Sequence, residues 1–338
     1  YLKNLINKYP DNTIVFPTEF YRFMVSLDES LNIYDNEIES TKWSEDVEFR
    51  HWDRSNNARE IYRSSVIAEV TCHTHTFTSK ALLEFLTRIE KKTSNGIDRA
   101  LSINNNEISP TYFYYDCIDY DTTSFFNNVT QLQDIIVTPK KFKVDTLPLF
   151  LEGAVRHMKT ISSVEQLNSI YQNVKSSELY DQNLQMFKIS GSLKQMGQEI
   201  GRMVAFSPGW LENESIWLHM SYKFYLELLR GKLYDAFYLE ISTGVVAFMD
   251  SLKFGRSPLE AASFIVSSAF PDKKLHGAGF LARLSGSTAE FLSMWIILFQ
   301  GHQPFYLNES NEIQLKLSPI LARWLFYSDG TISFKFLG

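Results

Sequence analysis

The sequence predicts a mainly helical protein with a short β-rich stretch at its C-terminal end, and three observations support this prediction. Apolar residues recur with helical spacing through most of residues 1–303, as in residues 78–91. From Glu312 onward apolar and polar residues alternate instead, as they do in strands. Asp329-Gly330 separates two of these alternating runs, and this dipeptide is frequent in hairpin turns. We therefore expect a helical domain over 1–303 and the first strands of a β-domain over 304–338.

Residues that typically begin or end helices support the individual helix predictions as much as the spacing of apolar residues does. Ser162 and Ser163 form a cap before residues 164–174, Gly231 stops the helix that precedes it, and Pro258 suits a first helical turn. The remaining predicted helices cover residues 2–9, 148–159, 214–230, 232–240, 258–268 and 287–300. The last of these is almost wholly apolar in its second half, so we expect it to be buried on all sides. Residues 112–120 are aromatic and β-branched, which predicts a strand or an extended loop.

Composition and charge exclude several classes of protein. The chain is 44% hydrophobic and 14% aromatic, which excludes a disordered chain. Its net charge is −6 and its basic residues are scattered, so no basic stripe is present to bind nucleic acid. Cys72 and Cys117 give no disulfide framework, which favours a cytoplasmic setting. No apolar run is long enough to span a membrane. Because Tyr1 opens what resembles a mid-protein helix, we expect a fragment of a longer chain, inactive alone.

The segment from Gly201 to His219 is rich in groups that bind anions and sugars. Pro208-Gly209 predicts a turn, and Glu212 is expected to open a helix that carries His219. Glu212 and His219 are then two helical turns apart and share a face. A carboxylate accepts hydrogen bonds from sugar hydroxyls, and a histidine can donate one to phosphate. An N-capped helix with a buried, satisfied histidine is the alternative interpretation.

A second segment has the composition of an anion site. Small residues at 285–288 directly precede the apolar helix, where backbone N–H groups and hydroxyls can bind an anion. Arg283 can add positive charge. A plain Ser/Thr cap, with glycine for close packing, is the alternative. The lysine of a phosphate-binding P-loop is missing, which excludes that motif.

These two segments resemble the cellobiose and chitobiose phosphorylase group, glycoside hydrolase family 94, and its relatives that act on β-1,3-glucans and oligoglucans. The similarity rests on the pattern GRxxxFxPGxxENxxxxxH, from Gly201 to His219, and on R-L-[ST]-G-[ST], which begins at Arg283. More loosely, residues 18–326 are similar to the C-terminal part of that family's catalytic region. The resemblance implies an (α/α)6 barrel, incomplete at its N-terminus, followed by a β-rich domain. Successive helix pairs of similar length agree with such a barrel.

The resemblance also implies phosphorolysis, with inversion, of a β-linked gluco-oligosaccharide or β-glucan to release α-glucose 1-phosphate. Phosphate would be a co-substrate, and neither a cofactor nor a metal is expected. The partners would be the saccharide and phosphate, with a homodimer left open. The implied residues should converge on one concave surface. For phosphate they are His219, Ser285 and Gly286, with Arg283 beside them, and for the sugar they are Glu212 and Trp210.

Inverting phosphorolysis needs one general acid, because phosphate is itself the nucleophile. The family carries this acid in a DWND-like motif, and Trp52-Asp53 resembles half of it. Arg54 stands where the acid would be expected. Asp53 is the first candidate because of that resemblance, with Asp116 and Asp119, and after them Asp46, as alternatives. Burial beside Trp52 would keep the Asp53 carboxyl protonated.

Two other functions compete with phosphorolysis. One is a non-catalytic carbohydrate-binding barrel that has lost its acid, and the other is an inverting glycoside hydrolase on the same fold. A hydrolase would need a second carboxylate to activate water.

His73 and His75 would share one face of a strand, but no third metal ligand of suitable spacing follows them.

Overall fold

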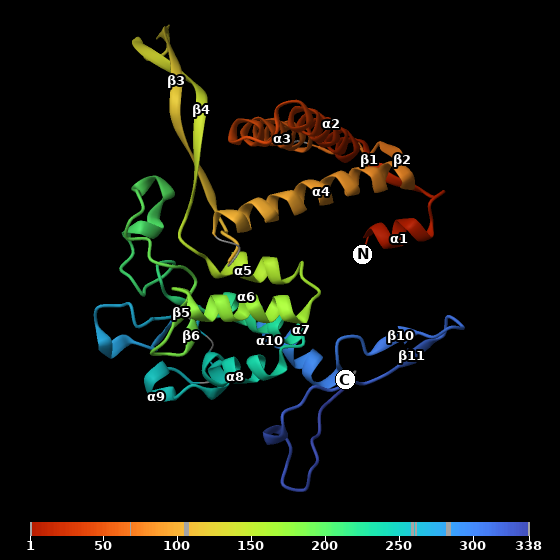
Figure 1. The fold of residues 1–338 in the computed structure, drawn as a ribbon, viewed down its shortest axis with the longest axis vertical. Helices are drawn as coiled ribbons and strands as arrows, with labels where there is room; N and C mark the ends of the chain where they lie inside the picture. Colours follow the sequence, from red (N-terminus) through yellow and green to blue (C-terminus); the bar gives the residue numbers. More distant parts are fainter. Residues whose placement is uncertain are drawn as a thin grey trace. The chain divides into compact units, whose positions relative to one another are not determined.

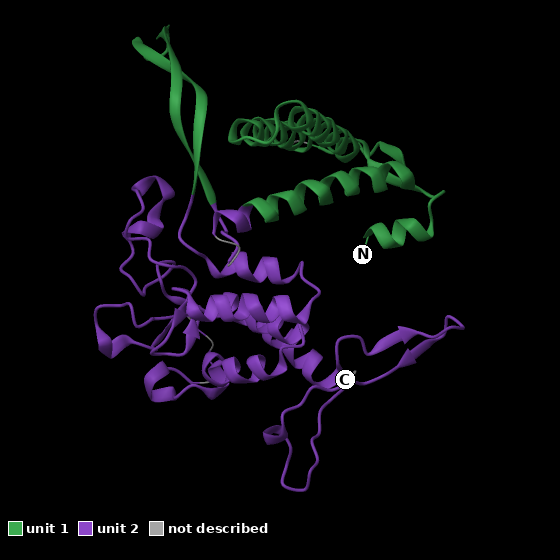
Figure 2. Ribbon diagram, in the orientation of Figure 1, with its two compact units in different colours: residues 1–99, 113–145 green, residues 100–112, 146–338 purple. Residues whose placement is uncertain are grey.

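The computed structural model describes residues 2–67, 69–104, 108–257, 260, 262–281 and 285–336. The chain divides into two compact units (Figure 2). Unit 1 comprises residues 1–99 and 113–145, and unit 2 comprises residues 100–112 and 146–338. Each unit has its own cluster of buried apolar side chains.

The predicted (α/α)6 barrel is wrong. About 49% of the structure is helical, but 19% is strand, and the described residues form several small antiparallel sheets rather than a closed ring of helices. Unit 1 uses helices of up to 25 residues, whereas the longest helix of unit 2 has 16. A barrel of stacked helix pairs needs helices of matched length, and this chain does not supply them.

Three long helices dominate unit 1 (Figure 1). They are α2 (Thr18–Thr41), α3 (Glu45–Val66) and α4 (Ser79–Ile103), preceded by the short α1 (Leu2–Lys8). Two strands, β1 (Thr13–Pro17) and β2 (Thr74–Thr78), pair antiparallel, with Thr13 opposite Thr78. The helix predicted over residues 2–9 is confirmed, and the one predicted over 78–91 is confirmed but continues to Ile103. Apolar side chains of α1, α2 and α4 form the core: Ile6, Met24, Leu31, Leu82 and Phe85.

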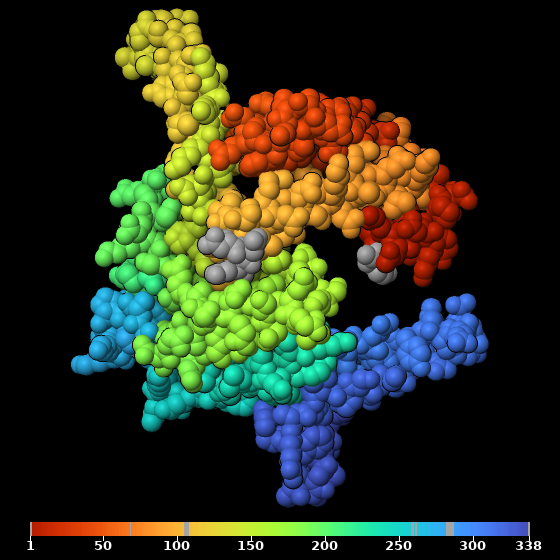
Figure 3. Space-filling model, viewed as in Figure 1, coloured from red at the N-terminus to blue at the C-terminus, as the bar shows by residue number. Residues whose placement is uncertain are grey.

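A long two-stranded ribbon completes unit 1. It consists of β3 (Phe113–Asn127) and β4 (Leu132–Thr146), which confirms the strand predicted in the aromatic segment. At its base the ring of Phe142 stacks on Phe49 of α3, with centroids 4.0 Å apart. The outer part of the ribbon has no helix against it (Figure 3), and its side chains are mostly exposed.

A partly buried ionic cluster joins the helices of unit 1. The carboxylate of Glu48 on α3 accepts hydrogen bonds from the Tyr34 hydroxyl (2.7 Å) and the Trp43 indole (3.2 Å). It also accepts hydrogen bonds from Lys92 (2.5 Å) and Arg99 (3.1 Å) of α4. Burial raises the pKa of Glu48, but the hydrogen bonds from Lys92 and Tyr34 and the Lys92 charge outweigh burial and lower it to about 2. One carboxylate therefore links α2, α3 and α4.

The second unit is built around helix α7 (Leu218–Arg230), most of whose residues are buried. It packs against α5 (Leu151–Met158), α8 (Tyr234–Gly244) and α10 (Ser285–Gln300). Smaller elements surround this core. They are α6 (Val164–Ser176), α9 (Ser251–Phe254), the hairpin β5–β6 (Tyr180–Asp181, Met186–Phe187), the sheet β7–β8–β9 (Ile216–Trp217, Phe264–Ile265, Gly279–Phe280) and the hairpin β10–β11 (Phe305–Leu307, Ile313–Leu315).

Local capping decides which helix predictions hold in unit 2. The helix predicted over residues 164–174 is confirmed, and the Ser163 hydroxyl accepts the hydrogen bond of its cap from the Gln166 N–H (3.3 Å). Residues 148–159 and 232–240 are also helical over most of their length. None of the helices that the structure describes has the length and apolar character that a membrane crossing requires.

Non-local contacts overrule two helix predictions in whole or in part, and the expected burial of a third helix is also wrong. Residues 258–268 are not one helix, because Phe264 and Ile265 pair with strands on either side; Pro258 lies outside the described residues. The helix predicted from 214 begins only at Leu218. Residues 287–300 are helical as expected, but this helix is not buried on all sides. Exposed apolar side chains on α10 are Leu292, Trp295 and Ile296, at 55%, 44% and 48%.

The C-terminal segment contains less strand than predicted. Only Ile313–Leu315 pairs, with Phe305–Leu307, although the sequence predicts strands over most of residues 312–336. The predicted turn at Asp329-Gly330 does form, with the Tyr327 N–H bonded to the Thr331 carbonyl at 2.8 Å. Its flanking residues have no strand partner within the described part of the chain. The turn depends on local residues, so the sequence predicts it correctly. A strand also needs a second strand to pair with, and alternation of apolar and polar residues does not show whether one is present.

A tight contact in the core of unit 2 involves the last residue of α8. Tyr225 is fully buried, and its hydroxyl has no hydrogen-bond partner within the described structure. A Cβ atom on Gly244 would lie only 1.9 Å from that hydroxyl oxygen. Glycine is therefore required at this position because the tyrosine ring passes against the helix backbone.

Candidate functional site

The loop before α7 is folded by its own backbone. Gly209 adopts a positive φ of 80°, and a Cβ there would lie 2.5 Å from the Phe270 backbone nitrogen. The Gly209 N–H donates to the Asn213 carbonyl (2.8 Å), and the Asn213 side chain donates to the Phe206 carbonyl (2.8 Å). The turn predicted at Pro208-Gly209 is thus present. It delivers the chain into β7 and then directly into α7.

Glu212 and His219 are not on one helix. Leu211 and Glu214 have positive φ values of 48° and 58°, which interrupt any helix before residue 218. Lys188 pairs with Glu214 at 3.1 Å and draws that residue inward, since both side chains are nearly buried. Glu212 therefore lies in the loop, while His219 is in the first turn of α7.

Only one oxygen of the Glu212 carboxylate has a hydrogen-bond partner among the described residues. Its Oε1 accepts a hydrogen bond from Arg202 at 3.3 Å, and the Arg202 side chain is 80% exposed. Its Oε2 is buried and has no hydrogen-bond partner among the described residues. A buried acceptor without a donor is costly, and it is a ready partner for a hydroxyl group of a ligand.

The aromatic rings of the candidate site pack against other aromatic rings. Trp210 contacts three phenylalanines, and its closest centroid distance is 4.7 Å, to Phe280. The Trp217 indole donates to the Leu211 carbonyl at 2.8 Å and meets the His219 ring edge to face at 5.5 Å. Aromatic packing therefore fixes both Trp210 and His219, and it leaves Trp210 only partly exposed.

The His219 ring lies in a positively charged setting. Burial lowers its pKa, the nearby Lys223 charge lowers it further, and the Glu152 carboxylate of α5 acts in the opposite direction. Glu152 is itself bonded by Arg156 (2.7 Å) and by the Tyr112 hydroxyl (3.1 Å). Lys223 forms no ion pair within 4 Å among the described residues. The charges of Lys223 and Glu152 thus act on His219 in opposite directions, and Arg156 pairs with Glu152.

Sequence reasoning missed three members of this cluster: Glu152, Arg156 and Lys223. The spacing of residues in the sequence does contain a signal for them. Glu152 and Arg156 are one helical turn apart on α5, and His219 and Lys223 are one turn apart on α7. That α5 and α7 pack together could not be known before the structure.

The remaining predicted phosphate ligands are only partly placed. Ser285 and Gly286 form the start of α10, a helix that packs against α7. Arg283 lies outside the described residues. The expected meeting of Ser285 with His219 and Glu212 on one surface stays a prediction.

The three candidate acids are all in unit 1 and all exposed. Asp53 is on α3, beside a Trp52 ring that is 52% exposed, and Arg54 is turned to Glu37 at 3.0 Å. Asp116 and Asp119 are on β3. None of the three has the burial that would keep a carboxyl protonated at neutral pH.

A metal site is not indicated by the described residues. They contain no group of three or more histidine, cysteine or acidic side chains that could hold an ion. The His75 ring stacks on Tyr21, with centroids 3.7 Å apart, which gives that histidine a packing role. Comparison with known proteins adds no further assignment: no protein-family model matches the chain, and no curated protein matches it either.

Proposed function

We propose that the chain carries part of the site of an enzyme that cleaves a β-linked gluco-oligosaccharide or β-glucan with phosphate. One observation carries the proposal: His219, a half-buried histidine whose pKa is lowered by burial, has Lys223 one turn away on the same helix, and Lys223 forms no ion pair within 4 Å among the described residues. The loop directly before that helix holds Glu212, whose buried oxygen lacks a donor. An anion and a sugar hydroxyl are the groups that such a pair of sites would bind.

In the proposed reaction a phosphate oxygen attacks the anomeric carbon as the glycosidic C–O bond breaks on the opposite face. The departing oxygen takes a proton from a general acid, and the product is an α-sugar 1-phosphate. His219 would donate one N–H to phosphate and Lys223 would supply charge, while Glu212 would orient the sugar. No general base is needed, because phosphate is already nucleophilic. The bound groups contribute by holding phosphate and sugar in position for the attack. The free, exposed Cys72 and Cys117 suit a cytoplasmic setting for this enzyme.

The test is the phosphate dependence of cleavage by the protein. Gluco-oligosaccharides of each β-linkage are incubated with and without phosphate, and α-glucose 1-phosphate is followed by NMR. Phosphate-dependent release of that product supports the proposal. Cleavage at the same rate without phosphate identifies an inverting hydrolase and contradicts it.

A second candidate function is carbohydrate binding without catalysis. The observation that favours it is the exposure of Asp53, Asp116 and Asp119, since none of the three lies in the enclosed surroundings expected of a general acid. Calorimetric binding of an oligosaccharide, without turnover at any phosphate concentration, would identify this function.

The general acid is assigned by replacing Asp53, Asp116 and Asp119 with asparagine, one at a time. The variant that lacks the acid should lose phosphorolysis of ordinary glucosides. It should keep activity on substrates with an activated leaving group, because these depart without a proton. Full activity of all three variants on ordinary glucosides would remove these residues from the proposal.

Replacing Lys223 with methionine should raise the KM for phosphate about tenfold, which corresponds to about 1.4 kcal/mol of lost binding. The KM for the saccharide should change little, because a methionine of similar length preserves packing on α7. Lys274→Met, at an exposed lysine of the same unit, is the matched control and should leave both constants unchanged. An equal rise in both KM values would show that Lys223 does not act on phosphate.

A further inference from the structure

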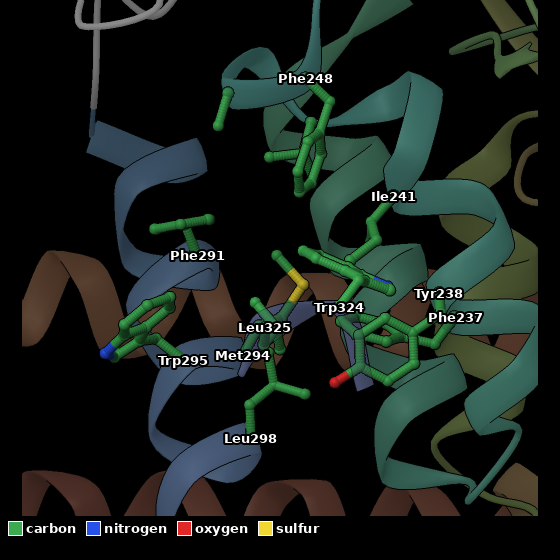
Figure 4. Close-up of a pocket in the computed structure, with 12 residues that line it drawn as sticks. Phe237, Tyr238, Ile241, Phe248, Phe291, Met294, Trp295, Leu298, Trp324 and Leu325 are labelled. Carbon is green, nitrogen blue, oxygen red and sulfur yellow. The ribbon is translucent and has the colours of Figure 1, made fainter. Parts of the chain in front are cut away.

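Unit 2 contains an apolar cavity that shares no residue with the candidate phosphate and sugar site. Its volume is about 120 Å³, and it lies between α8, α10 and the C-terminal segment (Figure 4). The rings of Phe248 and Trp324 lie near one another in Figure 4, and Phe291 and Trp295 line the same hollow from α10, so three separate stretches of chain contribute to it. Aliphatic side chains close the remainder of the wall: Ile241, Val245, Met294, Leu298 and Leu325.

The wall formed by the C-terminal segment is held by specific contacts. The Tyr238 hydroxyl donates to the Ile320 carbonyl at 2.6 Å and accepts the Ala322 N–H at 3.1 Å. The Trp324 ring then meets Tyr238 and Phe248 nearly at right angles, at 6.0 Å and 5.7 Å. Since both hydrogen bonds go to backbone, the only hydroxyl in the lining is already satisfied. The cavity therefore has a defined shape and offers no free polar group from Tyr238.

The chemistry of the lining selects what can enter. A bound water needs two to four polar partners, and no polar surface of the lining faces this space, so the cavity favours apolar contents. An apolar cavity of about 150 Å³ in another protein accepts benzene, which sets the scale for a space of this volume. Sugar hydroxyls would lose their hydrogen bonds to water here without replacement. A peptide strand would need backbone partners, which a wall of side chains lacks.

We propose that this cavity binds a small neutral molecule through a single apolar ring or branched alkyl group of about benzene size. Trp295 and Trp324 are each about half exposed, so the ligand reaches the cavity from solvent without local unfolding. A charged substituent would be excluded unless it stayed outside, because no ion or amide of the lining compensates its desolvation.

Calorimetric titration of the full chain with toluene, and with benzoate as its charged counterpart, tests the proposal. Toluene should bind with one site per chain, and benzoate should bind at least tenfold more weakly. Ala247→Phe introduces a ring at an exposed position of the lining and should weaken toluene binding at least tenfold. Leu252→Phe, at a 91% exposed position outside the lining, is the matched control and should bind toluene as the unchanged protein does.

Tyr238→Phe gives a second readout that leaves the volume of the cavity unaltered. Losing both hydrogen bonds to the C-terminal segment should free the Trp324 wall and weaken toluene binding, while far-UV circular dichroism stays unchanged. Equal binding of toluene and benzoate, or toluene binding that Ala247→Phe does not reduce, would overturn the proposal. So would the absence of toluene binding, or competition by a gluco-oligosaccharide, which would make the cavity a sugar subsite.

Discussion

Replacing Glu48 with glutamine should destabilise unit 1 by about 2 kcal/mol at pH 7, because removing one partner of a partly buried ionic cluster leaves the other charges uncompensated. Lys92 and Arg99 would keep their charges at 20% and 25% exposure with no carboxylate between them. Glutamine has nearly the same shape, so the effect is one of charge and not of volume. Urea unfolding followed by the fluorescence of Trp43, which bonds to Glu48, measures the loss.

Acid should abolish the same stabilisation in the unchanged protein. The pKa of Glu48 is lowered from 4.5 to about 2 in the folded state. A lowered pKa gives stability that is present above the unfolded value and is lost as pH falls through the folded one. The window is therefore pH 4.5 to 2, and Glu48→Gln should lose less stability there than the unchanged protein does.

Glu60→Gln, on the same helix, is the control for both measurements. Glu60 pairs with Arg63 one turn away at 2.6 Å, but both side chains are more than half exposed. Exposed pairs of this kind contribute a few tenths of a kcal/mol. A cost for Glu60→Gln as large as that for Glu48→Gln would show that burial of the Glu48 cluster is not what matters.

Placing alanine at Gly244 should destabilise unit 2 by about 3 kcal/mol, although alanine is otherwise the better helix former. Its Cβ would lie 1.9 Å from the Tyr225 hydroxyl oxygen, and the fully buried tyrosine ring cannot move aside. Thermal unfolding followed by near-UV circular dichroism would detect the change.

A double-mutant cycle with Tyr225→Phe separates this clash from other effects. Removing the hydroxyl deletes both the closest contact and a buried group that lacks a hydrogen-bond partner. Tyr225→Phe should therefore cost little alone and should reduce the cost of Gly244→Ala. Gly96→Ala on α4 is the matched control, since its Cβ would meet nothing closer than 3.9 Å and should stabilise its helix by up to about 1 kcal/mol. Destabilisation by both alanines would contradict the clash.

The features that the sequence predicts well are those decided within a few residues. The Ser163 cap, the turn at Gly209 and the turn at Gly330 each depend on a hydrogen bond or a φ value inside one turn of chain. Phe264-Ile265 was predicted as helix because its pairing partners, Ile216-Trp217 and Gly279-Phe280, are distant in sequence. The barrel failed for the same reason, since helix spacing says nothing about which helices pack together.

The predictions for the candidate site also divide into local features, which hold, and non-local ones, which do not. Glu212 and His219 are named correctly as polar residues of one segment, but their relation on a helix is wrong, because the Lys188–Glu214 pair bends the chain between them. Lys223 is one turn from His219 on α7 and could have been found from its spacing, whereas Glu152 comes near His219 through the packing of α5 on α7, which no local pattern encodes. Asp53 was expected to be buried beside Trp52, yet α3 presents both to solvent.

The ribbon β3–β4 also sets the order in which a growing chain can fold. Helices α1–α4 leave the ribosome before the ribbon, but the Phe49–Phe142 stack at the base of the ribbon joins residues from the early and late parts of unit 1. Residues 100–112, which belong to unit 2, are synthesised in between. Contacts between distant parts of a chain form slowly, so the first helices must wait through the synthesis of the whole ribbon with the Phe49 surface uncovered. Nascent chains released before residue 142 should therefore be more sensitive to protease at α3 than those released after residue 146.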